Sequence, residues 1–154
     1  MTVRPTAAIP VALTACVLFA SPALAALGGP YASVAADRSH FAARVASTSA
    51  ATHTIHTLTL PNGGTVKEYT RSDGTVFAVA WSGRGRPDLR QLLGPWFDVM
   101  QADNAVRTGP PRRRPLSVGR SNFIVHSGGH SGAFWGLALL PGLAPAGFSA
   151  NDLK

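Results

Sequence analysis

Residues 52–81 read THTIHTLTLPNGGTVKEYTRSDGTVFAVAW. The stretch holds three runs rich in threonine, valine and aromatic residues, a composition that is typical of β-strands. The turn signals PNGG and SDG separate these runs, and Asn62-Gly63 favours a tight hairpin because both residues tolerate positive φ. The three runs, residues 52–60, 65–70 and 75–81, are therefore predicted to form an antiparallel meander.

The third run and the segment after it indicate how this sheet is covered. Residues 76–81 are apolar at every position, which predicts a central strand with both faces buried. Residues 88–106 then carry a stripe of apolar side chains at helical spacing. Its members are Leu89, Leu92, Leu93, Trp96, Phe97 and Met100. Gly94-Pro95 interrupts the stripe, so we expect a kink, or a new helix that starts at Pro95.

The flanking segments give weaker signals. Ser33 is placed to cap a short helix over residues 34–45, and residues 46–51 are small and polar like a linker. Residues 122–126 and 133–140 have the composition of a fourth and a fifth strand, with Gly128-Gly129 as a turn between them.

These elements predict one α+β domain, with an antiparallel sheet of four to five strands and a kinked amphipathic helix packed on one face. The expected organisation is a cleavable signal peptide over residues 1–25 and an N-terminal segment with a short helix over residues 26–51. The single α+β domain follows over residues 52–140, and residues 141–154, which are spaced by proline and glycine, are expected to form a flexible tail.

The first 25 residues have the pattern of a secretory signal. Arg4 precedes an uncharged apolar stretch, and Ala23 and Ala25 are small residues at the −3 and −1 places of a cleavage site. We therefore expect an exported protein that is periplasmic or extracellular. As a minor alternative, Leu13-Thr14-Ala15-Cys16 is similar to a lipobox, which would anchor the chain to lipid through Cys16.

Composition limits how the chain is held together and what it attracts. Cys16 is the only cysteine, so cleavage after Ala25 would leave a chain without disulfides, and the sequence predicts no transmembrane span after the signal. The net charge is +7, mostly from arginine, and it attracts anionic partners. Outside the cytoplasm we expect an envelope protein or an anionic envelope polymer rather than nucleic acid. Arg112, Arg113 and Arg114 form a triplet whose role the sequence leaves open.

The first candidate site lies at the end of the third run. Trp81 precedes a loop that carries Arg84 and Arg86, and aromatic and guanidinium groups together suit the binding of sugars, lipids or protein. We therefore assign Trp81, Arg84 and Arg86 as a candidate partner-binding site. The alternative is a core tryptophan followed by solvated arginines.

The second candidate site is catalytic. The sequence from Gly129 to Ala133, GHSGA, is similar to the nucleophile elbow of the α/β-hydrolases, but it ends in alanine instead of glycine. That fold also needs a catalytic histidine after the serine, and no histidine follows His130. His126 and His130 flank the predicted turn, yet zinc normally takes three or four protein ligands. His53 and His56 lie three residues apart in a strand, so they should point to opposite faces. No catalytic, metal or cofactor-binding residue is assigned.

Several stretches together carry a resemblance to a known family. They are LGG at residues 27–29, Asp37-Arg38, LPNGGTVKEY at residues 60–69, GTVFAVAW at residues 74–81, and PDL and LLG at residues 87–89 and 92–94. In these stretches the chain resembles the domain-of-unknown-function family 2844 of small exported bacterial proteins. The resemblance implies export and supplies no activity, ligand or catalytic residue.

The leading functional hypothesis is therefore a non-enzymatic binding or accessory protein of the cell envelope that acts through a sheet edge and the Arg84–Arg86 loop. One alternative is a small hydrolase or metal-dependent enzyme centred on His126, His130 and Ser131. A second alternative is a structural secreted component.

Overall fold

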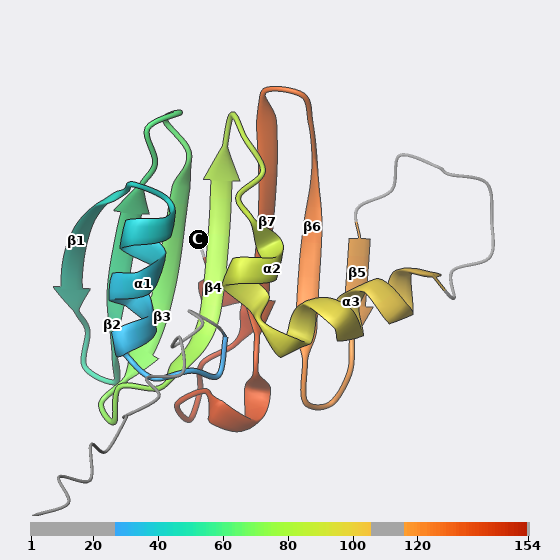
Figure 1. Cartoon of the computed structure of the whole chain (residues 1–154). Helices are drawn as coiled ribbons and strands as arrows, with labels where there is room; N and C mark the ends of the chain where they lie inside the picture. The colour runs from blue at the N-terminus through green and yellow to red at the C-terminus, as the bar shows by residue number, and fades with distance from the viewer. Residues whose placement is uncertain (1–26, 106–115, 154) are drawn as a thin grey trace, which may run out of the picture.

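A computed structural model describes residues 27–105 and 116–153, and it shows one antiparallel sheet of seven strands (Figure 1). The strand order is β1-β2-β3-β4-β7-β6-β5. The strands are β1 (Arg44–Ser49), β2 (His53–Thr59), β3 (Thr65–Arg71), β4 (Val76–Gly83), β5 (Leu116–Gly119), β6 (Ile124–His130) and β7 (Ala133–Leu139). The helices are α1 (Ala32–His40), α2 (Leu89–Leu93), α3 (Pro95–Ala105) and the 3-10 turns η1 (Pro141–Leu143) and η2 (Ala150–Asp152).

The predicted meander is confirmed as β2, β3 and β4, which pair consecutively and antiparallel. Its first turn is closed by the amide of Leu60, which donates to the Gly64 carbonyl at 2.8 Å, while Gly63 has a φ of 81°. The Asn62 side chain accepts from the Gly64 amide at 2.8 Å, which is the local bond that makes asparagine a good turn residue. β4 is the middle strand and is buried on both faces along residues 76–81, as its composition predicted.

The strand number is the main correction to the predicted fold: the sheet has seven strands, not four to five. β1 occupies most of the segment interpreted as a linker. Its residues are small and polar because it is an edge strand whose six residues are all exposed, so it shows no apolar alternation. β5 is only four residues long, too short to give a periodic signal.

The predicted position of the turn between β6 and β7 is also wrong. Both Gly128 and Gly129 lie inside β6, and the chain reverses after His130, which pairs with Ala133. Gly128 allows a close approach of the Trp135 ring instead of forming a turn, because a Cβ there would lie 2.9 Å from that ring. A glycine pair in a strand can mark such a contact as readily as a turn.

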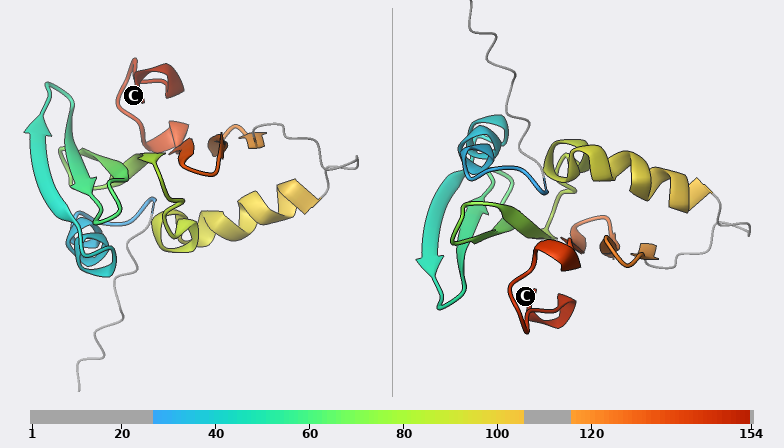
Figure 2. Two further views of the ribbon diagram at one scale, coloured as in Figure 1. Left: turned by 90° about the horizontal axis from the view of Figure 1, so that it is seen from above. Right: turned by 90° about the horizontal axis from the view of Figure 1, so that it is seen from below.

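The helices and the C-terminal segment cover opposite faces of the sheet (Figure 2). α1, α2 and α3 lie on one face, and residues 141–153 lie on the other. The predicted interruption at Gly94-Pro95 is confirmed as a restart: α2 ends at Leu93 and α3 begins at Pro95. α1 ends at His40, five residues before the predicted end of that helix. No helix of the described residues is long and apolar enough to cross a membrane.

Instead of fraying, the segment expected to be a tail packs on the sheet. The Phe148 ring meets Phe77 edge-on with centroids 4.9 Å apart, and Leu153 is 7% exposed. These residues build a second, smaller core with Tyr69 and Leu139. β4 therefore contributes to two cores, one beneath the helices and one beneath the C-terminal segment.

Candidate functional site: the loop end of the sheet

Three connections meet at one end of the sheet, the upper end in Figure 1. They are the β2–β3 turn (residues 60–64), the loop from β4 to α2 (residues 83–88) and the β6–β7 turn (residues 130–133). Residues from all three line one hollow of about 630 Å³. We call this region the loop-end surface and define it by five side chains: Asn62, Arg84, Arg86, Phe134 and Trp135.

Glycines allow these loops to touch. Gly83 has a φ of 130°, and a Cβ on it would lie 2.6 Å from the Gly64 Cα atom. A Cβ on Gly85 would lie 2.5 Å from the Nδ2 atom of the Asn62 side chain. The loop after β4 therefore packs closely against the β2–β3 turn. Its two arginines, Arg84 and Arg86, extend from this packed loop.

Arg84 and Arg86 are both exposed, and neither pairs with a carboxylate among the described residues. Arg84 lines the hollow at the loop end. The Arg86 guanidinium lies over the Phe134 ring, 5.3 Å from its centroid, in cation–π geometry. Within residues 27–105 and 116–153, these two arginines therefore lie beside aromatic rings and have no negatively charged partner.

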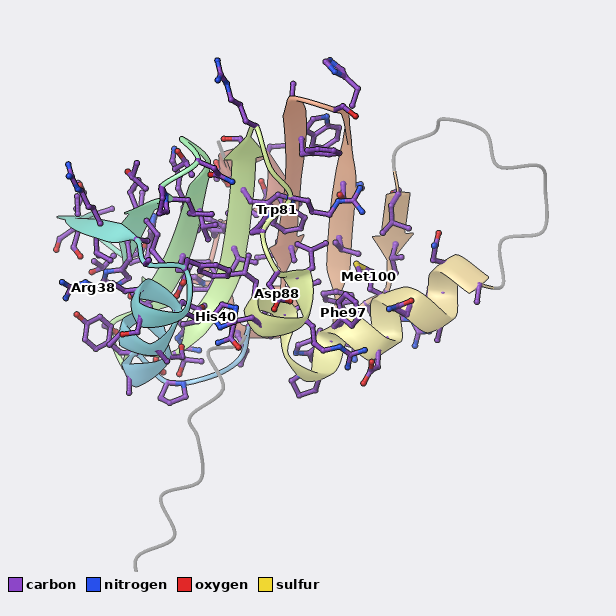
Figure 3. The ribbon with its side chains drawn as sticks, turned by 45° about the horizontal axis from the view of Figure 1, so that its top comes forward. Arg38, His40, Trp81, Asp88, Phe97 and Met100 are labelled. Atoms are coloured by element: carbon purple, nitrogen blue, oxygen red, sulfur yellow. The ribbon has the colours of Figure 1, made fainter. Side chains whose placement is uncertain are left out.

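Trp81 is not part of this surface. It is 3% exposed and packs in the core beneath the helices, where Figure 3 shows it between the sheet and the helical layer. The ring covers Gly136, where a Cβ would lie 2.2 Å from it. Its indole nitrogen has no hydrogen-bond partner among the described residues. Trp81 is thus the core tryptophan of the alternative interpretation.

Trp135 supplies the exposed aromatic ring that sequence reasoning assigned to Trp81. It is 42% exposed and lies against Gly128 of the neighbouring strand. Trp135 borders the hollow that Arg84 lines. It also borders a smaller hollow of about 220 Å³ on the face of the sheet that the C-terminal segment covers, and Lys67 and Leu153 help to line this second hollow. A glycine opposite a tryptophan can indicate that the ring lies over the neighbouring strand. The sequence alone does not show that Gly128 of β6 pairs with Trp135 of β7, so this signal could not be used.

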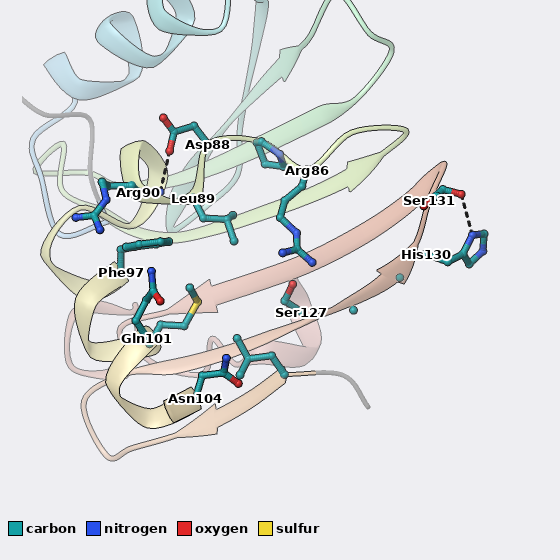
Figure 4. A pocket seen from close by; sticks show the side chains of 15 residues that line it. Arg86, Asp88, Leu89, Arg90, Phe97, Gln101, Asn104, Ser127, His130 and Ser131 are labelled. Carbon is teal, nitrogen blue, oxygen red and sulfur yellow. Dashed lines mark hydrogen bonds between the residues drawn. The ribbon is translucent and has the colours of Figure 1, made fainter. Parts of the chain in front are cut away.

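A longer groove of about 1010 Å³ runs from the loop end between α3 and β6 (Figure 4). Arg86 and Ser127 line it, with Phe97 and Met100 on the helical side. Arg90 also lines the groove, but its guanidinium lies 3.3 Å from the Asp98 carboxylate and 4.6 Å from the centroid of Phe97. Among the arginines that line the groove, Arg86 is the one without a described acidic partner.

The residues of the predicted catalytic alternative are not brought into a catalytic arrangement. His126 and His130 lie on the same strand instead of facing each other across a turn. The His130 Nδ1 atom is 3.1 Å from the carbonyl oxygen of Ser131, not its hydroxyl (Figure 4). Within residues 27–105 and 116–153, no group of three or more histidine, cysteine, aspartate or glutamate side chains is placed to hold a metal.

The two histidines of β2 point to opposite faces, as predicted. The His56 ring hydrogen-bonds with Ser47 at 2.8 Å and Thr70 at 3.0 Å on the helix side, and burial lowers the pKa of His56. The His53 ring packs edge-on to Phe148 on the C-terminal side, 5.2 Å between centroids. Both are packing and hydrogen-bonding residues of the sheet.

Sequence reasoning missed a pair of buried acids. Asp37 of α1 and Glu68 of β3 are 2% and 1% exposed, and their carboxyl groups hydrogen-bond to each other. The Gln91 side chain donates to Asp37 at 2.9 Å. Burial, and then the charge of Asp37, raise the pKa of Glu68 to about 9, and burial also raises the pKa of Asp37. The pair therefore holds a proton at neutral pH.

Some predicted residues lie outside the described part of the chain. They are Ala23, Ala25, Cys16, Arg112, Arg113 and Arg114.

Comparison with known proteins supports the expected family. No curated protein and no solved structure matches the chain. A family model described as protein of unknown function (DUF2844) matches residues 23–153, which is most of the chain and includes every stretch that carried the resemblance. The expected relationship is thereby confirmed, and the chain belongs to this family.

Proposed function

We propose that this protein is a non-enzymatic binding protein of the cell envelope that holds an acidic polysaccharide on its loop-end surface. The observation that carries the proposal is the position of Trp135 and Arg84: an exposed indole and a guanidinium without an acidic partner in the described part of the chain border the same hollow. The envelope location rests on the signal-like N-terminus and on the family resemblance.

The chemistry of these side chains suits a sugar that carries a carboxylate. An exposed indole offers a flat apolar face with a polar edge, which matches the face of a sugar ring. Arginine binds carboxylates through two parallel hydrogen bonds, and its planar fork selects them over spherical anions. Asn62 adds both a donor and an acceptor for hydroxyl groups.

The rest of the molecule supports an anionic partner. The chain carries a net charge of +7, which raises the local concentration of polyanions around it. The contact surface is also rigid, because the loop after β4 packs against the β2–β3 turn at Gly83 and Gly64. Binding to it therefore requires little ordering of the protein.

Two matched polymers test the proposal: polygalacturonate, and the same polymer with its carboxylates methyl-esterified. We expect the protein to bind the acidic polymer and to bind the ester much more weakly. Arg84→Gln and Trp135→Ala should each weaken binding about tenfold, or ~1.4 kcal/mol. Arg38→Gln, which removes an exposed arginine on α1, is the control and should bind as the unchanged chain does.

Two results would overturn the proposal. Equal binding of the acidic and esterified polymers would remove the role of the carboxylate. An equal loss of affinity in Arg38→Gln and Arg84→Gln would show that the net charge, and not the loop-end surface, attracts the polymer.

A further inference from the structure

β1 is an outer strand with one free edge. It pairs with β2 on one side, and no described element lies on its other side (Figure 1). All six of its residues are exposed. An outer strand of this kind presents a row of unpaired backbone donors and acceptors that another strand can bind.

The hairpin turn shows which of these groups point outward. The Ala50 amide donates to the His53 carbonyl at 2.8 Å, so the pair that closes the β1–β2 turn is a hydrogen-bonded pair. Hydrogen-bonded and non-hydrogen-bonded pairs alternate along an antiparallel ladder. Thr48 and Ala46 therefore direct their backbone groups toward β2, whereas Ser49, Ser47 and Val45 direct theirs away from the sheet.

This edge lacks the features that normally prevent strand addition. Such features are lysine or another charge in the middle of the strand, proline, or a bulge that twists the edge away. Residues 45–52 contain no proline and no charged residue, and the register between β1 and β2 is continuous. The opposite edge strand, β5, has only four residues and offers much less backbone.

We propose that β1 pairs antiparallel with β1 of a second copy of this chain, on a twofold axis that passes through Ser47. Among the registers that bring outward-pointing backbone groups of both strands together, this one pairs all three outward-pointing residues of β1: Ser47 faces the partner's Ser47, and Val45 faces the partner's Ser49. Arg44, the one charged residue of the strand, faces the partner's Ala50, so no like charges meet. A twofold dimer closes, so the pairing ends at two copies.

The pairing joins two seven-stranded sheets into one continuous sheet. A twofold axis perpendicular to a sheet keeps its faces on the same side and reverses its strands. The helical layers of both copies therefore lie on one face, and the two loop-end surfaces lie at opposite ends. This inference stands independently of the proposed ligand.

Engineered cysteines test the register in the full chain with Cys16→Ser as background. Paired Ser47 Cα atoms would be about 5.5 Å apart, within the range of about 4.4–6.8 Å that a disulfide spans. The two Ser49 residues would be four residue steps apart along the strands, or about 13 Å. We expect Ser47→Cys to become a disulfide-linked dimer under mild oxidation and Ser49→Cys to stay monomeric.

A charge exchange tests the pairing without covalent bonds. Ala46 and Thr48 face each other across the axis, so Ala46→Glu/Thr48→Glu places like charges opposite one another, and Ala46→Glu/Thr48→Lys places opposite charges. Sedimentation should show a dimer for the unchanged chain and the Glu/Lys variant, and a loss of dimer for the Glu/Glu variant. Equal masses for the two variants, or cross-linking of Ser49→Cys as fast as Ser47→Cys, would overturn the inference.

Discussion

Asp37 on α1 and Glu68 on β3 share a hydrogen bond between two carboxyl groups that are almost completely buried. The other buried residues of α1 are Ser33 and Val34, so Asp37 supplies one of three buried contacts of this helix. Two buried carboxyl groups that hydrogen-bond to each other cannot both be charged without a large free-energy cost. The helix is therefore held by a pair that keeps a proton.

This proton makes stability depend on pH. The pKa of Glu68 rises from 4.5 to about 9 in the folded state, so between these values the folded chain binds more protons than the unfolded chain. The free energy of unfolding should therefore fall as the pH rises through this window, by up to about 1.4 kcal/mol per pH unit, and level off above it. Urea unfolding from pH 5 to pH 10 measures the slope.

Glu68→Gln separates this effect from other titrating groups. Glutamine donates a hydrogen bond to Asp37 as the protonated acid does, but it cannot lose the proton. The lowered pKa of His56 acts in the opposite direction, because it costs stability only as the pH falls below the ordinary histidine value. The slope above pH 7 should therefore vanish in Glu68→Gln, and a variant that keeps it would show that Glu68 is not the source.

A second prediction concerns the capping of α2 by Asp88. The carboxylate accepts from the amides of Arg90 and Gln91 at 3.0 and 3.2 Å, and it lies 3.4 Å from the His40 ring at the end of α1 (Figure 3). Asp88→Ala should lower the free energy of unfolding by about 1 kcal/mol through the loss of the cap. Asp98→Ala removes an exposed acid of α3 that pairs with Arg90, and should change it by less than about 0.5 kcal/mol. Equal losses in the two variants would contradict the capping role.

Much of the sheet could be predicted because its signals are local. The 60–64 turn depends on Asn62 and Gly63. The start of a new helix at Pro95 depends on the proline ring of that one residue. The edge strand β1 could not be predicted, because an exposed strand of small residues has no apolar alternation. For the candidate site, the sequence predicted the exposed loop with Arg84 and Arg86, but the exposed indole belongs to Trp135 and not to Trp81. Whether a tryptophan side chain is exposed depends on which elements pack against its strand. Residues that are far apart in the sequence make these contacts, so the sequence near each tryptophan does not reveal them.

A third prediction uses the glycine under the buried tryptophan. A Cβ at Gly136 would lie 2.2 Å from the Trp81 ring, which is enclosed by the core and cannot move away cheaply. Gly136→Ala should cost about 1–3 kcal/mol of stability by overpacking. Gly119→Ala is the control, because no atom of the described residues lies within 4 Å of a Cβ there. Thermal unfolding of the two variants gives the comparison, and equal midpoints would contradict the close packing of Trp81.

The last prediction joins the packing of Trp135 to its proposed role. A Cβ at Gly128 would meet the Trp135 ring at 2.9 Å, but this ring is partly exposed and can tilt toward solvent. Gly128→Ala should therefore cost less than about 1 kcal/mol of stability, in contrast to Gly136→Ala. The tilted ring no longer presents the same face beside Arg84, so binding of polygalacturonate should weaken while the chain stays folded. Unchanged affinity, measured together with a shifted tryptophan emission, would show that the ring moved and that its orientation does not matter for the polymer.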